Sequence, residues 1–185
     1  TTGSSNNGLG YDALGANTEG NDNVAVGYQA LAANTTGDSN TALGHKALLN
    51  NTTADYNTAV GRYTMGVNTT GTRNAAIAPF ALAANTSGSY NNAIGYNSLG
   101  SNTTGNQNTA IGYYALVSNT SGLNNVAVGS YALQANTTGG WNAAFGYEAL
   151  AANTTGEFNT AVGAAALDAN TTGGNNTGLG LHALS

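Results

Sequence analysis

The sequence predicts an all-β fold, a parallel β-solenoid of about eleven coils of 17 residues each. The first observation is an internal repeat whose opening Asn returns every 17 residues without insertion or deletion. A repeat of fixed period is the signature of a solenoid, in which each unit packs mainly on its two neighbours. The second observation is two columns of large apolar residues, and the third is two nearly invariant glycines that divide each unit.

Residues 1–185 form a single repeat array with no second domain. We number the positions of each unit from 0 at its opening Asn to 16. The chain starts at the thirteenth place of this repeat and stops at the tenth, so we expect it to be excised from a longer fibre. The units begin at Asn6, Asn23, Asn40, Asn57, Asn74, Asn91, Asn108, Asn125, Asn142, Asn159 and Asn176.

The composition argues against several classes of partner. Charged residues make up 6% of the chain, and the net charge is −5 with a pI near 4.4. Nucleic acids and anionic membrane surfaces both need clustered Lys and Arg, so we expect neither as a partner. The absence of cysteine removes disulfides and thiolate metal sites, and we expect no cofactor and no metal. No apolar run approaches the roughly 20 residues of a membrane helix, so we expect no membrane insertion.

Two apolar columns are the predicted core. Position 8 is Leu in every unit except one, which has Met65. Position 2 and position 7 are mostly Ala, and such small residues mark a close approach by the opposite wall of the coil or by another chain. We expect both large columns to point inward. Position 3 comprises Leu9, Val26, Leu43, Val60, Ile77, Ile94, Ile111, Val128, Phe145, Val162 and Leu179.

The glycines predict two corners per coil. Position 4 is Gly except at Ala78, and position 14 is Gly in all but the unit that contains Ala54. Glycine at a fixed place indicates a positive φ or a tight corner. The segment before position 4 is β-branched and predicts a strand. The segment after it contains good helix formers, but 17 residues is short for a strand-plus-helix unit, so we favour a second strand. Pro79, at position 5, indicates a corner there.

Two polar columns are nearly invariant, Asn at position 0 and Asn-Thr at positions 11 and 12. Identical stacked Asn side chains can hydrogen-bond to one another along a solenoid, as amides do in cross-β ladders. We therefore interpret these columns as structural.

The variable columns at positions 5, 6 and 16 hold most of the aromatic residues and are the candidate binding surface. An exposed aromatic stripe can stack on sugars or fill a partner's pocket. The alternative is that these rings pack over a corner or against a neighbouring chain. The candidate ligand or partner residues are Tyr28, Tyr96, Tyr113, Tyr114, Tyr131, Trp141, Tyr147 and Phe158.

The sequence offers no support for catalysis. His45 and His182 lie eight coils apart, too far to cooperate. Asp38 and Asp55 are the only acids that share a column in adjacent coils. They could contact a cation or, in a polysaccharide-cleaving enzyme, form a carboxylate pair, but solvated like charges are the simpler interpretation. We predict that the chain is not an enzyme and has no catalytic residues.

The segments Asn57–Met65 and Asn159–Leu167, which follow the pattern N-T-A-V-G-x-x-A-L, resemble the head repeats of trimeric autotransporter adhesins. The fuller pattern N-T-T-G-x-x-N-T-A-[V/I/L]-G also resembles repeat arrays of bacteriophage tail fibres and bacterial surface fibres. The resemblance implies a left-handed β-roll, three chains packed side by side, and an extracellular location on a cell surface or virion. It also implies that the fibre segment presents a tip or itself binds a host-surface glycan or protein.

A second hypothesis is an ice-binding solenoid that uses the Thr and Asn columns. Thr fills position 12 from Thr18 to Thr171, and Thr or Ser mostly follows at position 13. Adjacent residues of a strand point to opposite faces, however, whereas a flat array needs Thr at alternate positions.

Overall fold

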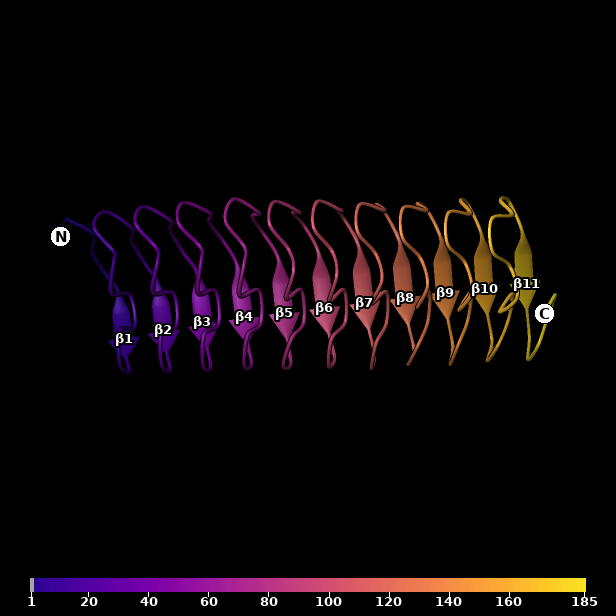
Figure 1. The fold of residues 1–185 in the computed structure, drawn as a ribbon, viewed down its shortest axis with the longest axis horizontal. Helices are drawn as coiled ribbons and strands as arrows, with labels where there is room; N and C mark the ends of the chain where they lie inside the picture. The colour runs from indigo at the N-terminus through magenta and orange to yellow at the C-terminus, as the bar shows by residue number, and fades with distance from the viewer. Residues whose placement is uncertain (1) are drawn as a thin grey trace.

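The computed structural model describes residues 2–185 as a single rod of stacked coils, each contributing one short strand to one parallel sheet (Figure 1). Neighbouring strands pair with a shift of one repeat, for example Ala93 opposite Ala110. No helix occurs within the described residues, and hence none that could cross a membrane. The predicted all-β parallel solenoid is therefore confirmed. The strands are β1 (Asn7–Leu9), β2 (Val24–Val26), β3 (Thr41–Leu43), β4 (Thr58–Val60), β5 (Ala75–Ile77), β6 (Asn92–Ile94), β7 (Thr109–Ile111), β8 (Val126–Val128), β9 (Ala143–Phe145), β10 (Thr160–Val162) and β11 (Thr177–Leu179).

Each strand covers positions 1 to 3 and stops before position 4, because the backbone at position 4 takes a positive φ. Gly112 has φ 140°, and a Cβ on it would lie 2.5 Å from the carbonyl oxygen of Gly129 in the next coil. Ala78 is the exception, with φ reduced to 110°. Pro79 follows it in a turn, and its carbonyl still accepts a 3.2 Å hydrogen bond from the N–H of Asn97. The corner expected at position 5 is confirmed.

The second predicted strand is wrong: the return segment of each coil is a series of turns. Positions 6 and 8 are left-handed, as at Tyr114 (φ 56°) and Leu116 (φ 52°), and this alternation breaks the β conformation. The coils still bond to one another here, with the N–H of Leu116 donating to the carbonyl of Ala132 at 3.0 Å. The wall is thus hydrogen-bonded from coil to coil without being a sheet.

The core is a narrow column of alanine and leucine. The position 8 side chains from Leu31 to Leu150, including Met65, are completely buried, which confirms the prediction for that column. The alanines at positions 2 and 7 in the same coils are also fully buried and belong to the same cluster. They are small because the two walls of one coil approach each other closely. Of the two predicted causes for the small residues, the opposite wall of the coil is therefore correct for these columns, and not another chain.

The prediction for position 3 is wrong, because these side chains point outward. In a strand successive side chains alternate between faces, so burial of Ala at position 2 turns positions 1 and 3 to the outside. We call the position 3 side chains the outer apolar column. Its exposed fractions are Leu9 70%, Val26 37%, Leu43 36%, Ile77 42%, Ile94 42%, Ile111 39%, Phe145 42%, Val162 37% and Leu179 76%, while Val60 and Val128 are half-buried.

Two buried amide ladders run along the rod and confirm the structural interpretation of the Asn columns. Asn108 donates from Nδ2 to Oδ1 of Asn91 at 3.2 Å, and Asn119 donates in the same way to Asn102 at 2.8 Å. Both also donate to the carbonyl of Gly122, at 2.8 and 3.0 Å. A Cβ on Gly122 would lie very close to Oδ1 of Asn119, so the close approach of this amide favours glycine. The coil with Ala54 at the same position shows that a small side chain can still be accommodated there, since the Ala54 carbonyl accepts both ladder bonds.

Candidate binding surface

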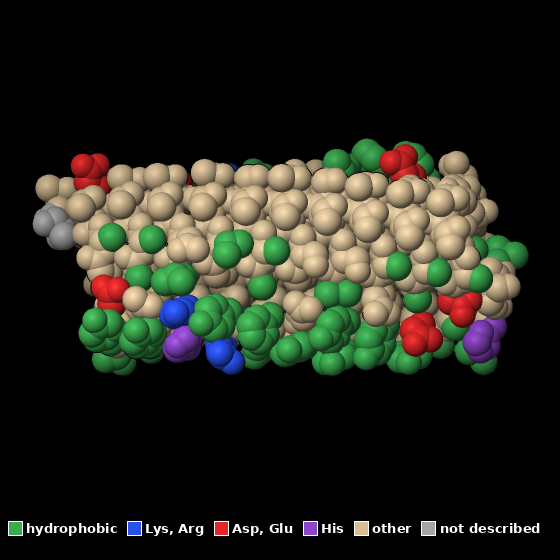
Figure 2. Space-filling view, viewed as in Figure 1, with side chains coloured by type: hydrophobic (Ala, Val, Ile, Leu, Met, Phe, Trp, Pro, Cys, Tyr) green, Lys and Arg blue, Asp and Glu red, His purple; other side chains and the backbone are tan. Residues whose placement is uncertain are grey.

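Aromatic rings line the corner that follows the strands, along the lower edge of Figure 2. Ring centroids in successive coils lie between 5.3 and 6.1 Å apart, so the rings form one continuous series, which we call the aromatic ladder. Such spacing is typical of favourable offset-stacked and edge-to-face pairs. The ladder comprises Tyr11, Tyr28, His45, Tyr63, Phe80, Tyr96, Tyr113, Tyr114, Tyr131 and Tyr147.

The ladder is continuous although no single column is aromatic throughout. Phe80 at position 6 meets Tyr96 at position 5 of the next coil, with centroids 5.8 Å apart. Tyr113 and Tyr114 occupy both positions of one coil and lie 4.4 Å apart. Rings from either position therefore reach the same strip of surface, a feature that column-by-column reading of the sequence does not reveal.

The eight predicted residues divide between two surfaces. Six belong to the aromatic ladder: Tyr28, Tyr96, Tyr113, Tyr114, Tyr131 and Tyr147. Trp141 and Phe158 lie instead at position 16, the corner that precedes the strands, where their rings stack at 5.3 Å and remain about half exposed. The structure thus brings together most of the predicted set but not all of it.

All three basic side chains of the protein contact aromatic rings. The Arg62 guanidinium lies 5.1 Å from the Tyr63 ring centroid and 5.8 Å from that of Phe80. The Lys46 ammonium lies 5.6 Å from the centroid of the same Tyr63 ring. These distances are within the range of cation–π attraction. Arg73 lies at the opposite corner, between Tyr56 and Tyr90.

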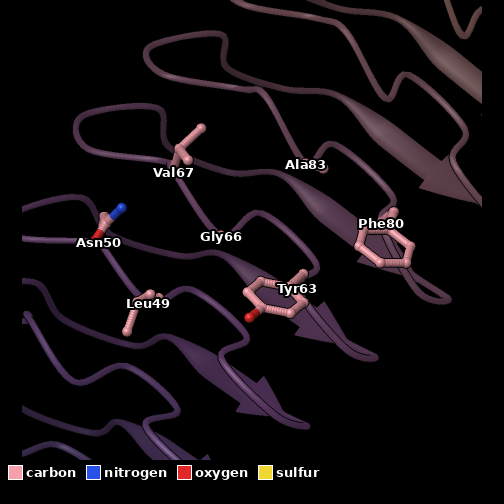
Figure 3. Close-up of a pocket in the computed structure, with 7 residues that line it drawn as sticks. All are labelled: Leu49, Asn50, Tyr63, Gly66, Val67, Phe80 and Ala83. Atoms are coloured by element: carbon pink, nitrogen blue, oxygen red, sulfur yellow. The ribbon is translucent and has the colours of Figure 1, made fainter.

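A pocket of about 270 Å³ opens beside the ladder, and the sequence interpretation missed it (Figure 3). The rings of Tyr63 and Phe80 form one side, and residues at positions 9 and 10 of the return segment form the rest. The signal in the sequence was Gly66, which stands at position 9 between Leu49 and Ala83 and leaves room where its neighbours have side chains. The lining residues are Leu49, Asn50, Tyr63, Gly66, Val67, Phe80 and Ala83.

The two carboxylates considered for catalysis or cation binding form hydrogen bonds within the fold. Oδ1 of Asp38 accepts the backbone N–H of Asn21 at 2.6 Å, and Oδ1 of Asp55 accepts that of Asp38 at 2.7 Å. Ser89 accepts the corresponding N–H two coils further on, at 3.0 Å. The two carboxylates therefore accept the same coil-to-coil hydrogen bond that the uncharged Ser89 accepts at this position of another coil. Within residues 2–185 no three His, Asp or Glu side chains gather as metal ligands would.

One ladder residue has a perturbed acidity. A hydrogen bond to the neighbouring Glu148, followed by the charge of that carboxylate, raises the pKa of the Tyr147 phenol above 10.0. The phenol is therefore neutral at physiological pH and remains a hydrogen-bond donor.

No family model, curated protein or solved structure matches this chain. The rod itself offers three surface features that a ligand or partner can use. These are the outer apolar column on the sheet, the aromatic ladder at one corner, and the pocket with its adjacent cations.

Proposed function

We propose that this chain is a non-catalytic structural and adhesive fibre segment, located outside the cell on a surface adhesin or on a virion. In this proposal three copies pack side by side as a homotrimer, and the rod presents or mediates binding to a glycan or protein of a cell surface. The observation that carries the proposal is the outer apolar column, a row of Val, Ile, Leu and Phe that faces outward along the whole sheet.

The outer apolar column favours self-association. Soluble monomers rarely expose contiguous apolar patches of more than a few hundred Å². A row repeated at the same place in every coil suits a partner with the same repeat, because identical coils can pack in register along the full rod. The number three comes from the resemblance to trimeric adhesin heads.

The buried ladders suit a rod that bears load. Each coil is bonded to the next through the strands, the return segment and both Asn ladders. At about 4.8 Å per coil the array is roughly 50 Å long. The aromatic ladder lies on the corner that follows the strands and supplies rings for contact with a cell-surface ligand (Figure 2).

The test is the solution mass, measured by light scattering coupled to size exclusion. We expect three times 18.3 kDa for the native chain. Replacing Ile94 and Ile111 together by Asn should give a folded monomer, since both side chains point outward and Asn92 already stands on that face. Thr104→Ala, an exposed change away from the sheet, is the matched control and should leave the mass unchanged. A native chain that elutes as a monomer would refute the assembly.

Ice binding is the alternative, and the position 13 column favours it. The hydroxyl at position 12 is already used, as Oγ1 of Thr103 donates to the carbonyl of Thr120 in the next coil at 3.0 Å. Position 13 leaves an exposed Thr or Ser in every coil from Thr36 to Thr172. One such column is narrow for an ice face. Thermal hysteresis of the purified chain at millimolar concentration would favour this function over the fibre.

A further inference from the structure

We propose that the pocket between Tyr63, Phe80, Gly66 and Val67 binds one anionic sugar unit, a pyranose ring that carries a carboxylate. This inference rests on the proposed adhesive function and names its ligand class. It is carried by three observations on the same few coils: a built cavity, stacked rings, and the local concentration of positive charge.

The cavity has the size and lining of a subsite for one ring. Its volume of about 270 Å³ is slightly below the roughly 300 Å³ from which small-ligand pockets usually start, so it suits a single ring and not a larger ligand. The nearly parallel rings of Tyr63 and Phe80, with an interplanar angle of 7° and centroids 5.9 Å apart, line one side of the cavity (Figure 3). The C–H groups of a sugar can pack against these rings, while Asn50 and the Tyr63 hydroxyl are polar groups that can orient its hydroxyls.

The positive charge beside these two rings favours an anionic ligand. The protein has eight acidic and three basic residues, yet Lys46 and Arg62, two of the three basic ones, lie over the Tyr63 ring. Acids occur in the same two columns only at Asp12 and Glu148, at least two coils away. A guanidinium offers two parallel N–H donors to a carboxylate, which makes Arg62 the better partner for one.

The pocket remains open in the proposed assembly. Its lining residues come from the corner and the return segment, at positions 6, 9 and 10, and none comes from a strand. The outer apolar column belongs to the strands. Packing of copies through the sheet therefore leaves the pocket accessible to a ligand.

Gly66 provides a variant that fills the pocket without disturbing the fold. Its φ is not positive, and a Cβ there would meet its nearest neighbour, the Tyr63 carbonyl oxygen, at an ordinary 3.5 Å. The coil before it already carries Leu49 at the same position. Gly66→Leu should therefore fold and occupy the cavity. Ala151→Leu introduces the same side chain at position 9 of a distant coil and is the matched control.

The experiment is a titration of the ¹⁵N-labelled full chain with methyl glucuronide and, separately, with methyl glucoside, followed by amide chemical shifts. We expect saturable shifts centred on Gly66 and Val67, with the neutral glucoside about five-fold weaker, the contribution of an exposed ion pair. Arg62→Ser should bring the two probes to equal affinity, and Ser130 shows that this column accepts Ser. Gly66→Leu should abolish the shifts, whereas Ala151→Leu should not.

Several results would overturn the inference. Absence of saturable shifts, equal affinity of the native chain for both sugars, or undiminished binding by Gly66→Leu would each do so. The titration and the light-scattering mass fail independently. A monomer that binds glucuronide would refute the trimeric fibre but support the sugar-binding pocket. A trimer that binds neither sugar would support the fibre and refute the pocket.

Discussion

Removing one amide from the position 0 ladder should destabilise the rod strongly, and Asn108→Ala is the change that tests it. Asn108 is completely buried. Its Nδ2 donates to Asn91 Oδ1 and to the Gly122 carbonyl, and its Oδ1 accepts the backbone N–H and the Nδ2 of Asn125. Alanine removes all four of these bonds while leaving the backbone path unchanged.

The size of the loss in unfolding free energy depends on which hydrogen-bond partners of Asn108 are left without a bond. The N–H of Asn125 loses its 3.0 Å acceptor inside the rod, and such a buried donor costs about 2 kcal/mol. The 2.8 Å bond to Gly122 contributes about 1 kcal/mol, although that carbonyl keeps Asn119 as a donor. The two amide bonds of 3.1 and 3.2 Å add about 0.5 kcal/mol each. The expected loss is about 4 kcal/mol of unfolding free energy.

Urea unfolding followed by circular dichroism measures this loss. With a slope of about 2 kcal/mol per molar, the midpoint should fall by about 2 M urea. Thr104→Ala is the control, since the Thr104 side chain is exposed, and it should stay within about 0.5 kcal/mol of the native chain. Amide exchange at Asn125 should accelerate in the Asn108 variant. Equal midpoints for the two variants would show that the ladder does not stabilise the rod.

Three further outcomes test the core, the corner and the ladder. Leu116→Asp puts a carboxylate into the core and should lower the unfolding free energy by about 4 kcal/mol or more. Tyr114→Ala, at a half-buried residue, should lower it by only about 1–2 kcal/mol. Equal losses of melting temperature for the two variants would contradict the core assignment. Ala78→Gly should raise stability by about 1 kcal/mol, because relief at φ 110° outweighs the added chain entropy; a lower melting temperature would show that Ala78 is unstrained. Glu148→Gln should lower the pKa of Tyr147 towards 10.0 in an NMR titration of the ring. Because the folded pKa is raised, the associated stabilisation is present below pH 10 and is lost as pH rises through the folded value, and an unchanged pKa would contradict the assigned cause.

The repeat by itself determined the solenoid, its period and its parallel sheet, because an unbroken spacing of 17 residues allows each residue to stack only on its equivalent. It also determined the buried Leu column and the Asn ladders, since identical polar residues repeated at one place need partners at the same place. Pro79 correctly located the corner. Six of the eight predicted aromatic residues proved to lie on one continuous surface.

Only the tertiary structure decided which way position 3 faces. Composition favoured the larger side chain for the interior, but the two walls of a coil approach so closely that Ala at position 2 fits between them, and strand alternation then turns Ile94 and its equivalents outward. Left-handed residues such as Leu116 made the return wall a series of turns, although Leu carries no local signal for that conformation. The pocket at Gly66 likewise exists because side chains from three consecutive coils meet there, a juxtaposition that depends on stacking.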